Sequence, residues 1–156
     1  MARPSLAERE RAQVSRVVID ASIAIKWVVE EEGTALALSV RSSHDKLLAP
    51  DLLVSECANV LWKKVARGEL TAQEAQMAAR LLAASDIELI GTRAFLETAT
   101  RLAIRLNHPA YDCTYLALAM AQGCPFVTAD AAFVGKVRAE AEPAGTGTVV
   151  LLGEEA

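Results

Sequence analysis

The segment Val17-Val18-Ile19-Asp20-Ala21-Ser22 decides the fold, because it joins a short run of β-branched residues to a helix through one acidic residue. A run of this kind is typical of a strand that is buried on both faces of a sheet. The same arrangement returns near the C-terminus, where Phe126-Val127-Thr128 is a predicted strand and Asp130 follows it. Functional crevices in parallel sheets lie beyond the carboxyl ends of the strands. We therefore expect Asp20 and Asp130 to reach the same edge of one sheet.

Strands and helices alternate along the rest of the chain. The hydrophobic pattern predicts further strands over residues 46–49, 87–90 and 149–152, and helices over residues 22–29, 34–41, 51–67, 71–84, 95–106, 110–122 and 131–141. Asp51 is placed to cap one helix, Thr71 and Glu74 form a capping-box pattern, and Gly145-Thr146-Gly147 is a predicted loop. This alternation predicts an α/β fold, a three-layer α/β/α arrangement with a mostly parallel central sheet and right-handed crossovers.

Composition narrows the class of protein. The 156 residues fit one domain, and a content of 53% hydrophobic but only 4% aromatic residues favours helices over a buried sheet. The apolar runs fall short of the ~20 residues that a membrane helix needs. The first sixteen residues lack the hydrophobic centre of a secretory signal. We expect a cytoplasmic protein that does not span a membrane.

Cysteine and histidine give no sign of a disulfide framework or a zinc site. Cys57, Cys113 and Cys124 are an odd number at wide spacing, so we interpret them as small core residues. His44 and His108 fall in predicted loops, and we interpret both as ordinary surface residues.

Two more acidic residues, Glu56 and Asp112, fall inside otherwise apolar helices. Burying a lone carboxylate costs several kcal/mol, so both should face a cation or a cleft. Each of the four acidic residues also has a simpler explanation. Asp20 and Asp130 would serve as helix caps, Glu56 as a partly solvated helix residue, and Asp112 as a favourable charge at a helix N-terminus. The four together favour a metal site.

Four segments of the sequence resemble the signature segments of VapC-type PIN domains, and they occur in the order of that family. They are Val17-Val18-Ile19-Asp20-Ala21-Ser22, Pro50-Asp51-Leu52-Leu53-Val54-Ser55-Glu56-Cys57-Ala58-Asn59-Val60-Leu61, Tyr111-Asp112-Cys113-Thr114-Tyr115-Leu116-Ala117-Leu118-Ala119 and Val127-Thr128-Ala129-Asp130-Ala131-Ala132-Phe133. The resemblance implies a PIN domain over residues 17–152. It leaves an N-terminal extension, residues 1–16, and a C-terminal tail, residues 153–156, unexplained.

The resemblance also implies a function. Its acidic positions correspond to Asp20, Glu56, Asp112 and Asp130, which would be the catalytic residues and hold one or two Mg²⁺ or Mn²⁺ ions. Its supporting polar positions correspond to Ser22, Asn59 and Thr128, with the two hydroxyls helping to place the metal and its water. The implied protein is an endoribonuclease, the toxin of a type II toxin–antitoxin system. It would cleave RNA such as tRNA or rRNA, bind a cognate antitoxin and form a homodimer.

The chemistry of these residue types agrees with that role. Mg²⁺ prefers oxygen ligands and retains water, so a few carboxylates and substrate phosphate oxygens complete its shell, and the bound ion activates a water. The net charge of −4 at first argues against a nucleic-acid substrate. Without the four carboxylates, however, the chain has 16 acidic and 16 basic residues, so the remaining surface is neutral.

Two alternatives remain open from the sequence. The first is a PIN-like interaction module that binds a partner without catalysis. The second is an acidic-pocket phosphatase or receiver domain, although a phosphatase usually carries a second Asp where this chain has Ser22, and a receiver needs a phosphoacceptor where residues 87–90 are followed by Gly91.

Overall fold

A central sheet of parallel strands organises the molecule. The computed structural model describes residues 2–8, 14–140 and 148–154. Within them the sheet has five strands in the order β3-β2-β1-β4-β5, and every neighbouring pair is parallel. The strands are β1 (Arg16–Ile19), β2 (Lys46–Pro50), β3 (Glu88–Ile90), β4 (Phe126–Thr128) and β5 (Val149–Leu151). The five strands predicted from the sequence are confirmed.

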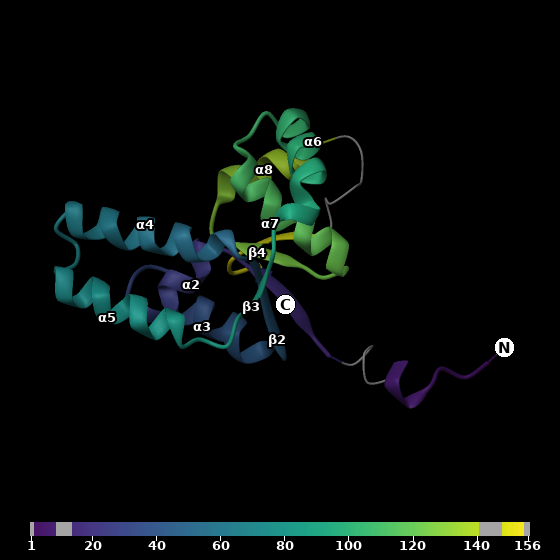
Figure 1. The fold of residues 1–156 in the computed structure, drawn as a ribbon, viewed down its shortest axis with the longest axis horizontal. Coiled ribbons are helices and arrows are strands. Elements are labelled where there is room, and N and C mark those ends of the chain that lie inside the picture. Colours follow the sequence, from purple (N-terminus) through teal and green to yellow (C-terminus); the bar gives the residue numbers. More distant parts are fainter. Residues whose placement is uncertain (1, 9–13, 141–147, 155–156) are drawn as a thin grey trace.

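Helices cover both faces of this sheet, which confirms the predicted three-layer α/β/α fold. Figure 1 shows two groups of helices on opposite sides of the strands. One group, along the crossovers from β1 to β3, is α2 (Ala21–Val28), α3 (Thr34–Ser43), α4 (Leu52–Ala66) and α5 (Ala72–Ala83). The other group, along the return to β4 and β5, is the 3-10 turn η1 (Arg93–Phe95), α6 (Leu96–Leu106), α7 (Ala110–Gln122) and α8 (Ala131–Ala139).

The strand order places a topological switch point between β1 and β4. From β1 the chain builds outward through β2 to β3, and it then returns to add β4 on the other side of β1. In such sheets the two crossovers leave on opposite faces, so a crevice opens beyond the carboxyl ends of the two strands. Val18 pairs with Phe126 and Ile19 with Val127, so both strands end at the same level. Asp20 and Asp130 both follow that level.

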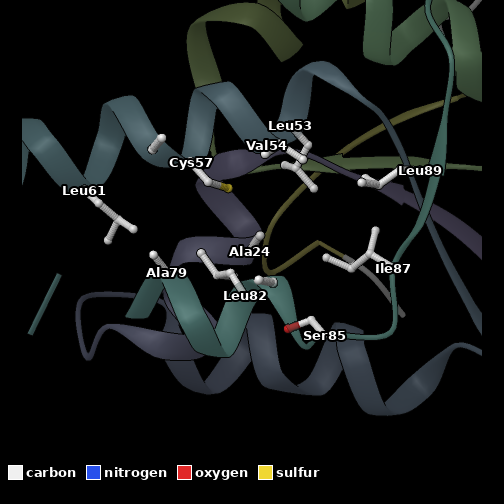
Figure 2. A pocket seen from close by; sticks show the side chains of 12 residues that line it. Ala24, Leu53, Val54, Cys57, Leu61, Ala79, Leu82, Ser85, Ile87 and Leu89 are labelled. Carbon is white, nitrogen blue, oxygen red and sulfur yellow. The ribbon is translucent and has the colours of Figure 1, made fainter. Parts of the chain in front are cut away.

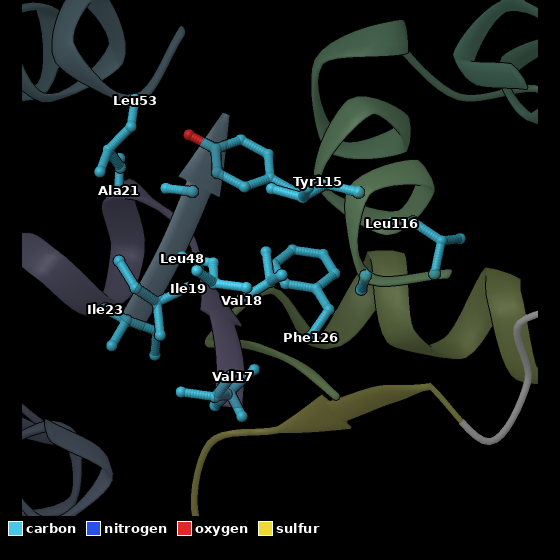
Figure 3. Close-up of a cluster of buried hydrophobic side chains, with 14 of the residues drawn as sticks. Val17, Val18, Ile19, Ala21, Ile23, Leu48, Leu53, Tyr115, Leu116 and Phe126 are labelled. Carbon is cyan, nitrogen blue, oxygen red and sulfur yellow. The ribbon is translucent and has the colours of Figure 1, made fainter. Parts of the chain in front are cut away.

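The core lies where β1 and β4 meet α7 and α8. Val17, Val18 and Ile19 are fully buried, as expected for a strand covered on both faces. Phe126 stacks on Tyr115 of α7 with ring centroids 5.6 Å apart. Figure 3 shows Val18 and the rings of Tyr115 and Phe126 in the space between the sheet and α7. This packing fixes α7, the helix that carries Asp112, against the two strands of the switch point.

Several local expectations are confirmed. Thr71 and Glu74 form the predicted capping box at the start of α5, with both reciprocal hydrogen bonds present. The three cysteines are buried free thiols. The predicted loop at 145–147 lies outside the described residues. Within those residues, no helix is long and apolar enough to cross a membrane.

Other details differ from the prediction. Asp51 precedes α4 but its side chain makes no capping hydrogen bond, so the predicted cap is wrong. The reason is that Asp51 already has a helical backbone conformation, and its N–H bonds to the carbonyl of Ile90 at the end of β3. The first strand begins at Arg16, one residue before the expected domain boundary. The helix expected from residue 95 begins as a 3-10 turn, and α8 ends at Ala139, before the predicted residue 141.

Candidate metal centre

Asp20 is the buried acidic residue at the switch point. It directly follows β1, and only 5% of its surface is exposed. Its Oδ1 accepts hydrogen bonds from Ser22 Oγ at 2.5 Å and from the N–H of Ile23 at 3.3 Å, and its Oδ2 accepts one from Thr128 Oγ1 at 2.5 Å. The bond to Ile23 is an N-cap of α2, so the simple capping explanation is also true. Capping uses only one oxygen, which leaves Oδ2 for Thr128.

Ser22 and Thr128 connect the two strands through Asp20. Each hydroxyl donates its hydrogen to Asp20 and accepts a backbone N–H after β4. Ser22 Oγ accepts from Ala129 at 3.0 Å, and Thr128 Oγ1 accepts from Asp130 at 3.1 Å. Both hydroxyls therefore hold the carboxylate and the start of the segment that carries Asp130. In the structure their direct partner is Asp20, and their expected role in placing the metal and its water stays a prediction.

Asp112 and Asp130 approach each other from two helices. Asp130 caps α8, with Oδ1 accepting the N–H of Phe133 at 3.0 Å. Asp112 lies in the first turn of α7, and its Oδ2 lies 2.6 Å from Nε2 of His108. One ligand atom from each of His108, Asp112 and Asp130 lies within 4.8 Å of the others. Among the described residues this is the group of acidic and imidazole side chains compact enough to surround one cation.

Glu56 contributes a buried carboxylate oxygen from α4. Its Oε1 and the hydroxyl of Tyr115 are the two buried side-chain polar atoms that lack a hydrogen-bond partner within the described part of the chain. Figure 3 shows the Tyr115 hydroxyl pointing from α7 toward Ala21 and Leu53, in the first turns of α2 and α4. Buried polar atoms are almost always satisfied, so an unpaired carboxylate oxygen beside other carboxylates fits a site for a cation or its water.

The electrostatics show that three of the carboxylates share one environment. Burial raises the pKa of Asp20 to about 6, although the hydroxyls of Ser22 and Thr128 oppose the shift. Burial, followed by the negative charges of Asp20 and Asp112, raises the pKa of Glu56 to about 7, although the nearby hydroxyl of Tyr115 opposes the shift. Like charges in a partly desolvated site disfavour ionisation, and a divalent cation removes that penalty. The oxygen-rich donor set therefore fits Mg²⁺ or Mn²⁺.

A family model described as a PIN domain matches residues 17–137. This chain belongs to the PIN domain family. The fold is similar to that of PAE2754 from Pyrobaculum aerophilum, with a TM-score of 0.66 and 20% identity over 90% of this chain and 92% of that chain. It is also similar to the VapC20 toxin of Mycobacterium tuberculosis, with a TM-score of 0.56 and 15% identity over 69% of this chain and 83% of that chain. None of the curated proteins compared with this chain matches it.

The PIN domain brings together most, but not all, of the residues singled out in the sequence. The charge of Asp112 raises the pKa of both Asp20 and Glu56, and Asp112 lies close to Asp130. Asn59, one helical turn beyond Glu56, is exposed on α4. Its role as a supporting residue stays a prediction.

His108 is the residue that the sequence analysis missed. It was interpreted as an ordinary surface residue, but its side chain is only 12% exposed and contacts Asp112 directly. Its ring also packs against Phe133, with centroids 4.9 Å apart. The available signal was spacing, because His108 lies four residues before Asp112 and Pro109 starts the helix between them. Spacing alone does not show which way a side chain in a turn points.

The raised pKa of Glu56 predicts how the metal-free PIN domain responds to pH. Its carboxyl has a higher pKa in the folded state than its ordinary value of 4.5, so the folded protein keeps a proton that the unfolded chain has lost between about pH 4.5 and 7. The free energy of unfolding should therefore fall as pH rises through this window. In EDTA, Glu56→Gln should melt at a temperature about 2–4 °C above wild type at pH 8, as expected for ~1 kcal/mol in a domain of this size.

Thermal melts of both proteins between pH 4 and 8 check this expectation. The difference between them should disappear near pH 4, where the carboxyl is neutral in both states. Saturating Mg²⁺ at pH 8 should stabilise wild type more than the variant. Parallel curves for the two proteins across the whole pH range would contradict a desolvated Glu56.

Proposed function

We propose that this PIN domain is a metal-dependent endoribonuclease and the toxin of a type II toxin–antitoxin system. The observation that carries the proposal is the group of acidic side chains at the switch point, where Asp112 and Asp130 offer ligand atoms within 4.8 Å of each other and Asp20 and Asp112 raise the pKa of the partly buried Glu56. Such a group is costly without a cation. PIN domains are generally nucleases, and the structurally similar VapC20 is described as a toxin that cleaves the sarcin–ricin loop, an RNA element.

Asp20, Glu56, Asp112 and Asp130 are the residues that would hold Mg²⁺ or Mn²⁺. When bound, the ion supplies a water of lowered pKa and neutralises charge on the phosphate. Ser22 and Thr128 keep both oxygens of Asp20 in place, so this carboxylate needs little reorganisation to bind. The Glu56 carboxylate, which the Tyr115 hydroxyl adjoins, would accept a hydrogen bond from the attacking water and orient it.

The two alternatives that the sequence left open have different outcomes. A phosphatase or receiver domain is set aside because the family match is to a PIN domain over most of the chain. A PIN domain that binds a partner without cleaving RNA would not require buried carboxylates of raised pKa at this place. The cleavage measurement below separates it from the proposed nuclease.

Conservative replacement of the acidic residues should abolish RNA cleavage without unfolding the protein. Asp20→Asn, Glu56→Gln, Asp112→Asn and Asp130→Asn should each reduce Mg²⁺-dependent cleavage of total RNA by at least about a hundredfold, because metal binding contributes several kcal/mol at the transition state. Cleavage should also stop in EDTA and return with Mg²⁺ or Mn²⁺.

A matched control for these variants is Asp86→Asn. Asp86 is an exposed acidic residue just before β3, at the opposite edge of the parallel sheet, so its replacement should leave cleavage unchanged. Circular dichroism shows whether each variant is folded. Wild-type cleavage by two folded variants of the acidic group would reject the assignment.

The cognate antitoxin is proposed on charge and on exposed apolar surface. An Arg of the partner would pair with the acidic group where a cation is otherwise required, and bidentate Arg–carboxylate pairs are strong. The chain also has a groove of about 400 Å³ between α4, α5 and the start of β3. Figure 2 shows its lining, which is almost entirely apolar. Val54 and Leu89 on its rim are 59% and 45% exposed, so an apolar segment of the antitoxin would gain contact there.

Expression of the chain in its host or a related bacterium should arrest growth, and the adjacent small open reading frame should relieve the arrest. Asp20→Asn should abolish toxicity. Val54→Asp should keep toxicity but lose relief, because it places a charge in the groove. Trp62→Asp, which changes an exposed residue of the same helix outside the groove, is the matched control and should still be relieved. Normal growth with abundant soluble wild-type protein would reject the toxin role.

A homodimer is proposed on the helices that the core covers least. In α5, Ala78 is the buried residue, whereas Met77 and Leu81 are each about half exposed. In α3, Ala37 and Val40 are buried, but Leu36 and Leu38 remain exposed. Apolar side chains of this kind are typical of surfaces that associate. Light scattering at micromolar concentration should give twice the chain mass of 16.6 kDa, and a monomer would reject this part of the proposal.

A further inference from the structure

His108 lies in the turn between α6 and α7, and its two neighbours in the sequence set the backbone of this turn. Asn107 before it ends α6 in the left-handed conformation with φ of 48°, and Pro109 after it starts α7. The turn brings Nε2 of the imidazole to 2.6 Å from Oδ2 of Asp112. The side chain is only 12% exposed, so this contact is largely protected from water.

One face of α8 holds the His108 ring in place. Asp130, Phe133 and Lys136 follow one another at intervals of three residues, which places them on the same side of the helix. Phe133 packs against the imidazole. Lys136 Nζ lies 3.3 Å from His108 Nδ1 and donates to the carbonyl of Asn107 at 3.0 Å. The helix α8, which begins after Asp130, therefore also holds His108, the partner of Asp112.

The contact with Lys136 determines which nitrogen of His108 carries the hydrogen. A lysine ammonium only donates hydrogen bonds, so Nδ1 must be the acceptor in this contact. A neutral imidazole then carries its hydrogen on Nε2 and donates it to Asp112 Oδ2. A nitrogen that carries a hydrogen has no lone pair for a metal. The compact group of His108, Asp112 and Asp130 therefore contains two oxygen ligands and one hydrogen-bond donor.

We propose that His108 is a positioning residue that orients Asp112 for metal binding. Lys136 keeps His108 in this role, because its ammonium can only donate to Nδ1 and so favours the tautomer with the hydrogen on Nε2. The inference deepens the proposed function and rests on it. The alternative is that His108 binds the metal directly through Nε2. That role would require the hydrogen on Nδ1 and displacement of Lys136. Residues that orient a ligand through a hydrogen bond typically change metal affinity by about ten- to a hundredfold when they are removed.

Nitrogen-15 NMR of the imidazole in the full-length protein tests the tautomer directly. Without metal, the spectrum should show the Nε2–H form of His108, and it should still show that form after saturation with diamagnetic Mg²⁺. Lys136→Met should allow the Nδ1–H form to appear, because the donor that excludes it is gone. An Nδ1–H form in the wild-type protein, or a switch to that form on addition of Mg²⁺, would overturn the proposal in favour of a direct ligand.

Calorimetric titration with Mg²⁺ alone tests the consequence for binding. His108→Ala should weaken affinity by about ten- to a hundredfold, whereas His108→Gln should stay close to wild type, since its side-chain amide can donate from nearly the same place as Nε2. In an Asp112→Asn background, His108→Ala should have little further effect, because both changes act through one carboxylate. Equal losses in the Ala and Gln variants, or wild-type affinity in His108→Ala, would overturn the proposal.

The same titration separates this inference from the proposed function. Wild-type protein that binds neither Mg²⁺ nor Mn²⁺ would reject both. Wild-type protein that binds Mg²⁺ and cleaves RNA, together with a folded His108→Ala variant of unchanged affinity, would reject only the role of His108. His108→Gln also keeps the test valid if His108→Ala fails to fold.

Discussion

The pair of hydrogen bonds from Ser22 and Thr128 to Asp20 is the interaction on which the site depends. The bond from Thr128 joins residues 108 positions apart, and Ser22, which lies two residues after Asp20, accepts the N–H of Ala129 across the same switch point between β1 and β4. The two hydroxyls also supply the hydrogen bonds that a buried carboxylate needs in order to exist in the core at all. Because each hydroxyl also accepts a backbone N–H after β4, the path of the chain toward Asp130 depends on the same two residues. Fold and site are therefore stabilised together at this point.

The acidic group reduces the stability of the metal-free fold. Asp20 and Glu56 both have raised pKa values because of burial, and Asp112 adds negative charge nearby. A protein selected for stability alone would place neutral side chains there. The rest of the core compensates, because Tyr115, Phe126 and Phe133 form a continuous aromatic cluster directly beneath the site. Apolar packing against the strands thus offsets the loss of stability caused by the acidic residues at the ends of the same strands.

The sequence predicted the strands and the layers well because each depends on local pattern. The buried run at 17–19, the capping box at Thr71 and the break at Pro109 act within a few residues. Asp51 shows the limit of such rules. It has a favoured capping residue type at the right place, but pairing of β2 with β3 sets its backbone and removes the cap. A long-range contact overrode a local preference.

The parts that were not predictable all depend on contacts between distant elements. The Tyr115 hydroxyl faces α2 and α4, and its ring stacks on Phe126 of β4. His108 reaches Asp112 because α8 supplies Phe133 and Lys136 on one face, and no pattern near His108 contains that information. Asp20 is held by hydroxyls at the ends of β1 and β4, whereas Asp112 is held by His108, whose ring packs against Phe133 of α8. The two halves of the site therefore depend on different contacts. A change in how the helices pack can move Asp112 while Asp20 stays in place.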